Sequence, residues 1–404
     1  MQIRKAKILM ILALALFLFF FSNDFGLIDV EKTSIITAVA IDASDDGGFE
    51  VTAQIAVPEA TDANTENQKA QLSGKGSTIG GALKDLGDVS GWFPKLAFCN
   101  LILIGNNLPY QNVITAIDYF AKTLRVQDSA LVAMAENSAR ELLETTTPLD
   151  NISSFALQKI MLKNTGFDRD VIATDVKTFC ADHYSIGGSA LMPLIKILPV
   201  QSGSSSSGSG ESSSLSGMQS GSGGGGQKNN QKLFDARSTA LFLHGVKVGE
   251  LDEDLTLTLN ALSTQISGTG VAVNNVPDEN GNTSDYLLTV IRSNPKLCLK
   301  ADDNQLTLNI NLKLYCKISD HAADNSDDAL SQNKPLPQNL ISATERLMRK
   351  NIDELIATTK QTGCDFLKIK EKLYRHNHKQ YSKYKDNYLS NLKTEVFVSI
   401  FGQS

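Results

Sequence analysis

The sequence predicts an α+β fold: two to three α/β-type subdomains with mixed or antiparallel sheets and a long helix near the C-terminus, preceded by one N-terminal hydrophobic anchor. The chain has 404 residues, of which 42% are hydrophobic and 20% charged, which is enough for two or three modest domains. Segments rich in β-branched residues alternate with segments of helical periodicity. A Ser/Gly-rich stretch divides the chain, which predicts four regions: 1–26, signal or membrane anchor; 27–200, N-terminal region; 201–232, disordered linker; 233–404, C-terminal domain.

The N-terminus has the pattern of an export signal. Arg4, Lys5 and Lys7 precede an uninterrupted apolar run at residues 8–21, and no Ala-x-Ala cleavage site follows directly. As a helix the run is about 21 Å long, short of the roughly 30 Å hydrocarbon core, although snorkelling lysines can extend it. An uncleaved anchor is favoured; a cleaved signal and a buried core helix stay open as alternatives. Cations before the run and acids after it place the rest of the chain outside the cytoplasm.

The N-terminal region begins with a predicted hairpin. Residues 34–42 and 49–58 are rich in β-branched residues and flank a turn rich in Asp and Gly. Residues 78–86 have apolar positions at helical spacing, and residues 97–104 are typical of a buried strand. A helix at 113–124, a strand at 130–135 and a helix at 138–144 are expected next. This order favours an α/β-type or α+β domain over a helix bundle or a β-sandwich.

The linker and the C-terminal domain have contrasting compositions. Serine and glycine make up 21 of the 32 residues at 201–232, so this segment buries little surface and is expected to be a flexible tether or a long disordered loop. Beyond it we expect a hairpin at 238–248 that turns at His244-Gly245, strands at 285–292 and 305–318, and a last strand at 394–401. A capping box at 342–345 opens a long helix that ends near Gly363, and a second helix starts near Asp365.

Several motifs suggest ligand or metal binding, but each is incomplete. Residues 73–78 resemble a phosphate-binding loop, yet Lys69 and Gly76 stand where the P-loop pattern needs Gly and Ser or Thr. Residues 42–47 resemble the start of a calcium loop, but its twelfth position is Ala53 in place of Glu. His376 and His378 lie two residues apart, so on a helix they point in different directions and cannot chelate one ion together.

No complete catalytic group emerges either. Asp182, His183 and Ser185 have the residue types of a hydrolase triad, but triad members come from separate elements and no G-x-S-x-G elbow is present. Carboxylate pairs at 302–303 and 327–328 lie in polar, turn-like stretches. We therefore assign no catalytic, cofactor-binding or metal-binding residue and expect no cofactor and no enzymatic activity. The five cysteines have no C-x-x-C spacing and could form two disulfides at most.

Charge is distributed unevenly along the chain. The net charge is −6, but residues 345–393 alone carry 12 Lys and Arg against 6 Asp and Glu, with tyrosines between them. Basic and aromatic residues together can indicate nucleic-acid binding, which an export signal makes implausible. The segment is expected to be a solvated helix face or, alternatively, a basic surface toward anionic lipid headgroups or an acidic partner.

The order of several short blocks resembles the Ger(x)C family, the C subunits of nutrient germinant receptors in the inner membrane of bacterial endospores. These blocks are 31–42 (EKTSIITAVAID), 74–82 (GKGSTIGGA), 101–105 (LILIG), 189–197 (SALMPLIKI), 239–249 (TALFLHGVKVG), 364–367 (CDFL) and 373–375 (LYR), followed by a strand that ends at Gly402. The resemblance covers nearly all of the chain beyond residue 26. Two departures stand out: Asp24 occupies the place of the family's lipidated cysteine, and the Ser/Gly segment is far longer than a usual connection.

The resemblance implies a non-enzymatic subunit that is anchored to the inner membrane of the spore and acts in germination. It also implies multi-pass A and B type membrane subunits as partners. The alternative is an extracytoplasmic solute-binding protein, which would have a concave pocket between its two halves. A third class, a secreted hydrolase, requires His183 or His244 near a nucleophile.

Overall fold

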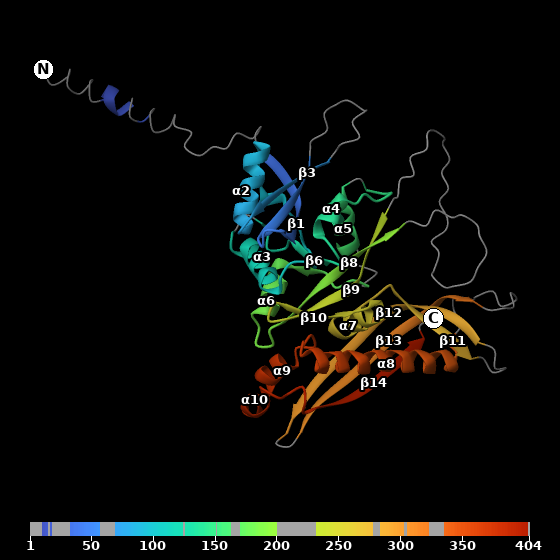
Figure 1. The fold of residues 1–404 in the computed structure, drawn as a ribbon. Coiled ribbons are helices and arrows are strands. Elements are labelled where there is room, and N and C mark those ends of the chain that lie inside the picture. Colours follow the sequence, from blue (N-terminus) through green and yellow to red (C-terminus); the bar gives the residue numbers. More distant parts are fainter. Residues whose placement is uncertain are drawn as a thin grey trace, which may run out of the picture.

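The computed structural model describes residues 10–14, 17, 33–56, 69–123, 126–150, 152–162, 170–199, 232–277, 283–302, 305–322 and 335–402. In these residues the chain forms two β-sheets with helices packed against them (Figure 1). We call the ten-stranded sheet in the upper part of Figure 1 sheet A and the four-stranded sheet below it sheet B. Most of the predicted anchor at 1–26 and nearly all of the predicted linker at 201–232 lie outside the described residues. No helix within the described part of the chain is both long enough and apolar enough to cross a membrane.

Sheet A has a parallel centre and antiparallel edges. Its strand order is β10-β9-β8-β6-β5-β1-β2-β3, with β4 beside β1 and β7 beside β6. The pairs β1–β5, β5–β6 and β6–β8 are parallel, whereas β1–β2–β3 and β8–β9–β10 pair antiparallel. The strand bounds are β1 Thr33–Ala43, β2 Phe49–Ala56, β3 Lys69–Gly76, β4 Phe93–Lys95, β5 Leu101–Ile104, β6 Leu131–Ala135, β7 Thr174–Asp175, β8 Ser189–Pro199, β9 Lys232–Leu243 and β10 Val246–Leu251. Both predicted hairpins, β1–β2 and β9–β10, are confirmed.

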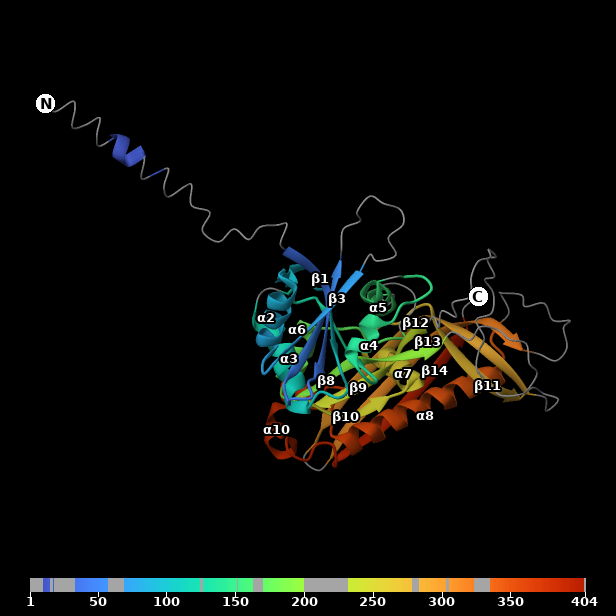
Figure 2. The ribbon, with the colours of Figure 1, turned by 45° about the horizontal axis from the view of Figure 1, so that its top comes forward.

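Helices cover both faces of sheet A. One face packs against α2 (Ile79–Ser90), α3 (Tyr110–Lys122) and α6 (Val176–His183), and the other against α4 (Ala139–Glu144) and α5 (Ser153–Leu162). Figures 1 and 2 show these two groups on opposite sides of the strands. Neighbouring residues of β5 therefore belong to different cores: Ile102 packs under the first group and Leu103 under the second. This double burial explains why β5 and β6 are apolar at every position.

Sheet A contains strands from both sides of the predicted linker. β8 precedes residues 201–231 and β9 follows them, and the two strands pair antiparallel from Ser189–Leu243 to Pro199–Lys232. The predicted division at 201–232 remains a prediction, but the first strands after it complete the sheet that the chain builds before it.

Sheet B has the order β11-β12-β13-β14 and is covered on one face by helices. Its strands are β11 Thr269–Pro277, β12 Thr283–Ala301, β13 Leu306–Ala322 and β14 Leu392–Gly402, and its helices are α7 Glu253–Ser263, α8 Gln338–Thr362, α9 Ile369–His376 and α10 His378–Tyr384. The long helix α8 buries Leu340, Met348, Ile352, Leu355 and Ile356 along one helical face, against alternating leucines of β13. The predicted fold class, α+β with two sheets and a long C-terminal helix, is thus confirmed.

Local differences from the predictions have physical causes. α8 begins at Gln338, directly after Pro337, so the capping box predicted at 342–345 lies inside the helix; proline is compatible with a helix start because no intrahelical partner is needed there. The strand predicted at 97–104 begins only at Leu101, because Leu96–Phe98 form a 3₁₀ turn. The helix predicted from Asp365 begins at Ile369, where Asp365 caps it.

Candidate functional site

The parallel strands of sheet A have their carboxyl ends on the same side of the sheet, which we call its carboxyl edge. Open α/β sheets bind ligands at this edge. β1 and β5 are in register from Ala38–Leu101 to Ile41–Ile104, so Asp42 and Gly105 emerge side by side. The amide of Gly105 donates to the carbonyl of Ile41 at 2.8 Å. Two of the sequence blocks singled out above, 31–42 and 101–105, therefore meet at this edge.

The carboxylate of Asp42 fills the position that a ligand anion would take. Its oxygens accept hydrogen bonds from the amides of Ala139 (3.0 Å) and Arg140 (2.8 Å) and from the hydroxyl of Ser138 (3.2 Å). These are the free amides at the start of α4, which attract negative charge. A Cβ atom at Gly105 would collide with the same carboxylate, so this position requires glycine. Burial raises the pKa of Asp42, although the two amides oppose the shift.

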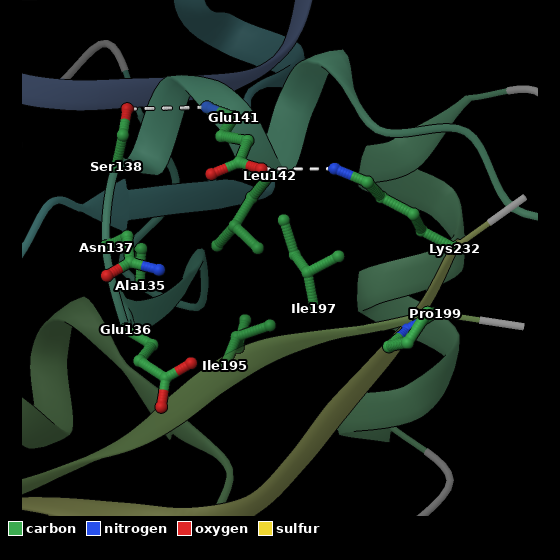
Figure 3. Close-up of a pocket in the computed structure, with 10 residues that line it drawn as sticks. All are labelled: Ala135, Glu136, Asn137, Ser138, Glu141, Leu142, Ile195, Ile197, Pro199 and Lys232. Atoms are coloured by element: carbon green, nitrogen blue, oxygen red, sulfur yellow. Dashed lines mark hydrogen bonds and ion pairs between the residues drawn. The ribbon is translucent and has the colours of Figure 1, made fainter. Parts of the chain in front are cut away.

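A small hollow lies next to this edge (Figure 3). Its volume is about 190 Å³, and its lining residues are Ala135, Glu136, Asn137, Ser138, Glu141, Leu142, Ile195, Ile197, Pro199 and Lys232. Figure 3 shows the ion pair between Glu141 and Lys232, 3.1 Å apart, above the aliphatic side chains of Leu142 and Ile197. The hollow is below the roughly 300–1,000 Å³ of typical small-molecule sites. It also lies at the edge of sheet A, whereas the solute-binding alternative expects a pocket between the two halves.

A second buried carboxylate, Asp365, joins sheet A to the C-terminal helices. Its oxygens accept from the amides of Ile369 (2.9 Å) and Lys370 (2.7 Å), and the hydroxyl of Tyr388 also hydrogen-bonds to it. Its own amide donates to the hydroxyl of Ser189 at 2.8 Å, in the first residue of β8. Burial raises the pKa of Asp365 and, together with the nearby carboxylate, that of Tyr388.

The neighbouring residues strengthen this junction. The thiol of Cys364 donates to the carbonyl of Phe242 in β9, with the two atoms 3.4 Å apart. Lys368 forms an ion pair of 2.6 Å with Asp182 in α6. The blocks at 189–197, 239–249 and 364–367, which are far apart in sequence, thus form one interface inside the protein.

The residues of the hypothetical triad have other partners. Asp182 is paired with Lys368, and the hydroxyl of Ser185 donates to the backbone carbonyl of Asp182 at 2.7 Å. His183 lies against the ring of Tyr184, and its Nδ1 atom is buried with no hydrogen-bond partner among the described residues. His244 forms the β9–β10 turn with a positive φ of 51°, and its amide donates to Gly188. These contacts do not form a nucleophile–base–acid chain.

The remaining candidate residues fold into ordinary local structure. The predicted loop at 73–78 is the end of β3 followed by Thr78, which caps α2 by accepting from the amide of Gly81 at 3.1 Å. His376 and His378 belong to different helices, which are separated at Asn377. The carbonyl of Asp302 accepts from Tyr384, whereas Asp303, Asp327 and Asp328 lie outside the described residues. Among the described residues, no group of three or more His, Cys, Asp and Glu could hold a metal ion.

All five cysteines are free thiols in the structure. Burial raises the pKa of Cys99, Cys316 and Cys364 to about 12, so these side chains remain protonated near neutral pH. Burial also raises the pKa of Cys180. These four thiols therefore have the character of structural residues and lack that of activated nucleophiles.

Sequence reasoning did not identify Asp42 or Asp365 as organising residues. The available signal was an acidic residue next to an apolar block: Asp42 ends the run at 34–42, and Asp365 lies between Cys364 and Phe366. An isolated carboxylate in such surroundings requires hydrogen-bond donors. The amides that bind Asp365 are close to it in sequence, but those that bind Asp42 belong to α4 and are brought to it only by the packing of that helix.

Comparisons with known proteins agree with this architecture. Residues 27–197 match the family described as spore germination protein N-terminal domain. Residues 237–401 match the family described as spore germination B3/GerAC like, C-terminal. No curated protein matches the chain.

One solved structure has a similar fold. The crystal structure of the GerBC protein superimposes with a TM-score of 0.51 at 15% sequence identity, and the match covers 93% of this chain and 100% of that chain. At this identity the match concerns the fold alone. The coverage of 93% means that the aligned part of this chain extends over both of its sheets.

Proposed function

The chain belongs to the Ger(x)C family of spore germination proteins, and on that premise we propose that it is a non-enzymatic, membrane-anchored C subunit of a nutrient germinant receptor that works through contacts with multi-pass A and B type subunits. The observation that carries the proposal is the match of both family domains, at 27–197 and 237–401, in the expected order. The inner membrane of the spore is the corresponding location.

The contacts of the buried acids support a non-enzymatic role. Asp42 and Asp365 lie where a catalytic acid or an anion site could be, but both carboxylates are held by backbone amides of their own chain. A carboxylate that satisfies helix starts in this way stabilises packing and leaves no free donor for a substrate.

The apolar run supports anchoring. The side chains of Met10, Ile11, Leu12 and Leu14 are 59–77% exposed, so these residues do not pack into either sheet's core. That argues against the buried core helix, which was one of the alternatives for this segment. Apolar side chains exposed in this way need another apolar environment, and a bilayer provides it.

The proposal is tested by isolating a tagged, full-length chain from spore membranes under mild detergent. We expect multi-pass membrane proteins to co-purify. The matched control is a chain that lacks residues 8–21: if the run is an anchor, this variant leaves the membrane fraction. Recovery of the tagged chain without any multi-pass partner would contradict the receptor-subunit proposal.

The solute-binding alternative gives the opposite result in a ligand screen. A solute-binding protein is stabilised by its ligand, so its Tm rises with ligand concentration. The receptor-subunit proposal expects no such response from the isolated chain. A reproducible shift that Glu136→Ala or Lys232→Ala abolishes would favour the alternative and assign it to the hollow in Figure 3.

A further inference from the structure

Four large apolar side chains are exposed between the last turn of α2 and the 3₁₀ turn that follows β4. Val89 is 79% exposed, Trp92 47%, Phe93 41% and Phe98 53%. We call these four residues the aromatic patch. Exposed aromatic residues so close together are unusual on a soluble surface, where single exposed apolar residues are the norm.

The aromatic patch is fixed beside the point at which the chain enters sheet A. α2 ends at Gly91, whose φ of 72° reverses the chain. The next residues form β4, which pairs parallel with the start of β1, with Phe93 opposite Thr33. The hydroxyl of Ser34 donates to the carbonyl of Phe93 at 3.3 Å. The backbone of the patch is therefore fixed by its pairing with the first residues of β1.

This entry point is connected to the apolar run by a short piece of chain. Residues 22–32 separate the run at 8–21 from Thr33. Even fully extended, this connection reaches only about 40 Å. The chain therefore enters the domain at the end that carries the aromatic patch, and this end cannot lie further than that reach from the end of the run.

The basic helices lie at the other end of the molecule. In both Figure 1 and Figure 2, α9 and α10 are far from the start of β1. An orientation in which residues 345–393 bind anionic lipid would turn the aromatic patch away from the membrane. The patch and the basic segment therefore make opposite predictions for the orientation of the chain.

We propose that the aromatic patch inserts into the headgroup region of the same membrane that holds the apolar run, and so fixes the orientation of sheet A on the bilayer. The inference rests on the proposed anchoring. Trp and Phe suit this position because their rings bury apolar area at the boundary between acyl chains and water. Of the nearby charges, Lys84 pairs with Asp88, and Lys95 is exposed between Phe93 and Phe98. A cation at this position suits the phosphate groups of lipid headgroups.

Trp92 is the only tryptophan in the chain, which makes its fluorescence a direct probe of the patch. The full-length chain is reconstituted into vesicles of neutral phospholipid, with and without brominated acyl chains. We expect a blue shift of the Trp92 emission and a loss of intensity with the brominated lipid, because bromine quenches only at close range. If the domain is attached to the membrane only through the apolar run and residues 22–32, neither effect is expected.

Two matched variants make the result specific. Val89→Ser together with Phe98→Ser removes apolar side chains that are already exposed, and it should reduce the quenching of Trp92. Trp92→Phe together with Phe397→Trp moves the probe to an exposed position of β14, where we expect no quenching.

The outcomes separate this inference from the proposed function. Flotation of the vesicles reports anchoring independently of fluorescence: a chain that does not float contradicts both proposals. If the chain floats but Trp92 is not quenched, the proposed insertion of the aromatic patch is wrong, while the proposed anchoring still stands. Quenching of the probe at position 397 in place of Trp92 overturns it in favour of the opposite orientation. If the Trp92 emission shifts to the blue only when multi-pass partners are present, the patch is a contact with another protein, which also contradicts the inference.

Discussion

β5 of sheet A is buried at all four of its positions, whereas β13 of sheet B alternates between buried leucines or isoleucines and polar residues. The difference follows from what covers each sheet. Helices pack on both faces of sheet A, as a parallel centre requires, whereas the helices that the structure describes beside sheet B pack on one of its faces. Within the described part of the chain, sheet A therefore has both faces buried, whereas sheet B has one face that its helices leave exposed.

The open face of sheet B is strongly basic. Its exposed cations are Arg292, Lys296, Lys300, Lys313, Lys317 and Lys393. Arg292 lies over the ring of Tyr315, which stacks on Phe401 of the neighbouring strand. This face extends the positive charge of the C-terminal helices and was not recognised in the sequence, because its cations come from three separate strands.

The first prediction compares β5, which is buried on both faces of its sheet, with β13, which is buried on one face. Ile102→Ala and Leu103→Ala, on adjacent positions of β5, should each lower the free energy of unfolding by about 2–5 kcal/mol, since both side chains are buried. On β13, Ile310→Ala should cost a similar amount, whereas Asn311→Ala should change stability by less than about 0.5 kcal/mol. Urea unfolding followed by circular dichroism measures these differences. Equal costs at positions 310 and 311 would contradict the comparison.

The second prediction concerns the edge of sheet A. Asp42→Ala removes three hydrogen bonds and leaves two amides of α4 without their acceptor, so stability should fall by about 2–3 kcal/mol. Asp42→Asn should cost less, because the side-chain oxygen of asparagine can still accept hydrogen bonds from these amides. The matched control is Asp46→Ala in the exposed β1–β2 turn, with an expected change below about 0.5 kcal/mol. A loss at position 46 as large as that at position 42 would rule out a special role for the Asp42 cap.

The third prediction concerns the junction between the sheets. Asp365→Ala removes the cap of α9, which should lower stability by about 1–2 kcal/mol. Hydrogen exchange should also accelerate at the amides of Ile369 and Lys370. Asp353→Ala on the exposed side of α8 serves as the control. If exchange at these amides is unchanged, the contact with Asp365 does not hold the start of α9.

The fourth and smallest effect is a pH dependence. Burial raises the pKa of Asp42 and Asp365 in the folded protein, so above the ordinary pKa of 3.8 the folded state binds more protons than the unfolded chain. The stability that these groups contribute is present at low pH and is lost as pH rises through the raised pKa. The stability of the unmodified chain relative to Asp365→Asn should therefore increase as the pH is lowered from about 7 to about 4.

Asp235 provides the control of opposite sign. Burial would raise its pKa, but hydrogen bonds from Arg237 outweigh burial and lower it. Its contribution is present above the ordinary pKa and is lost as pH falls, so the difference for Asp235→Asn should shrink on acidification. The same trend in both variants would contradict the assigned directions.

Much of the local structure could be predicted because its causes are local. β-Branched runs around an Asp/Gly turn predicted β1 and β2, and His244-Gly245 predicted the β9–β10 turn, where both residues have positive φ. Gly363, with a φ of 73°, ends α8 as expected. By contrast, β3 contains two glycines and looked like a loop, because a strand at a sheet edge is stabilised by its partner more than by its own residues.

By itself, the sequence determined the α+β class, the long C-terminal helix and the membership of two spore germination domains, because hydrophobic periodicity and the order of short blocks are properties of the chain alone. Only the tertiary structure decided that β8 and β9 pair across residues 201–231, that Asp42 holds the start of α4, that Asp365 contacts Ser189 of β8, and that aromatic residues lie where the chain enters sheet A. These features depend on contacts between residues tens to hundreds of positions apart. Their energy comes from burying specific groups together, which no local pattern records.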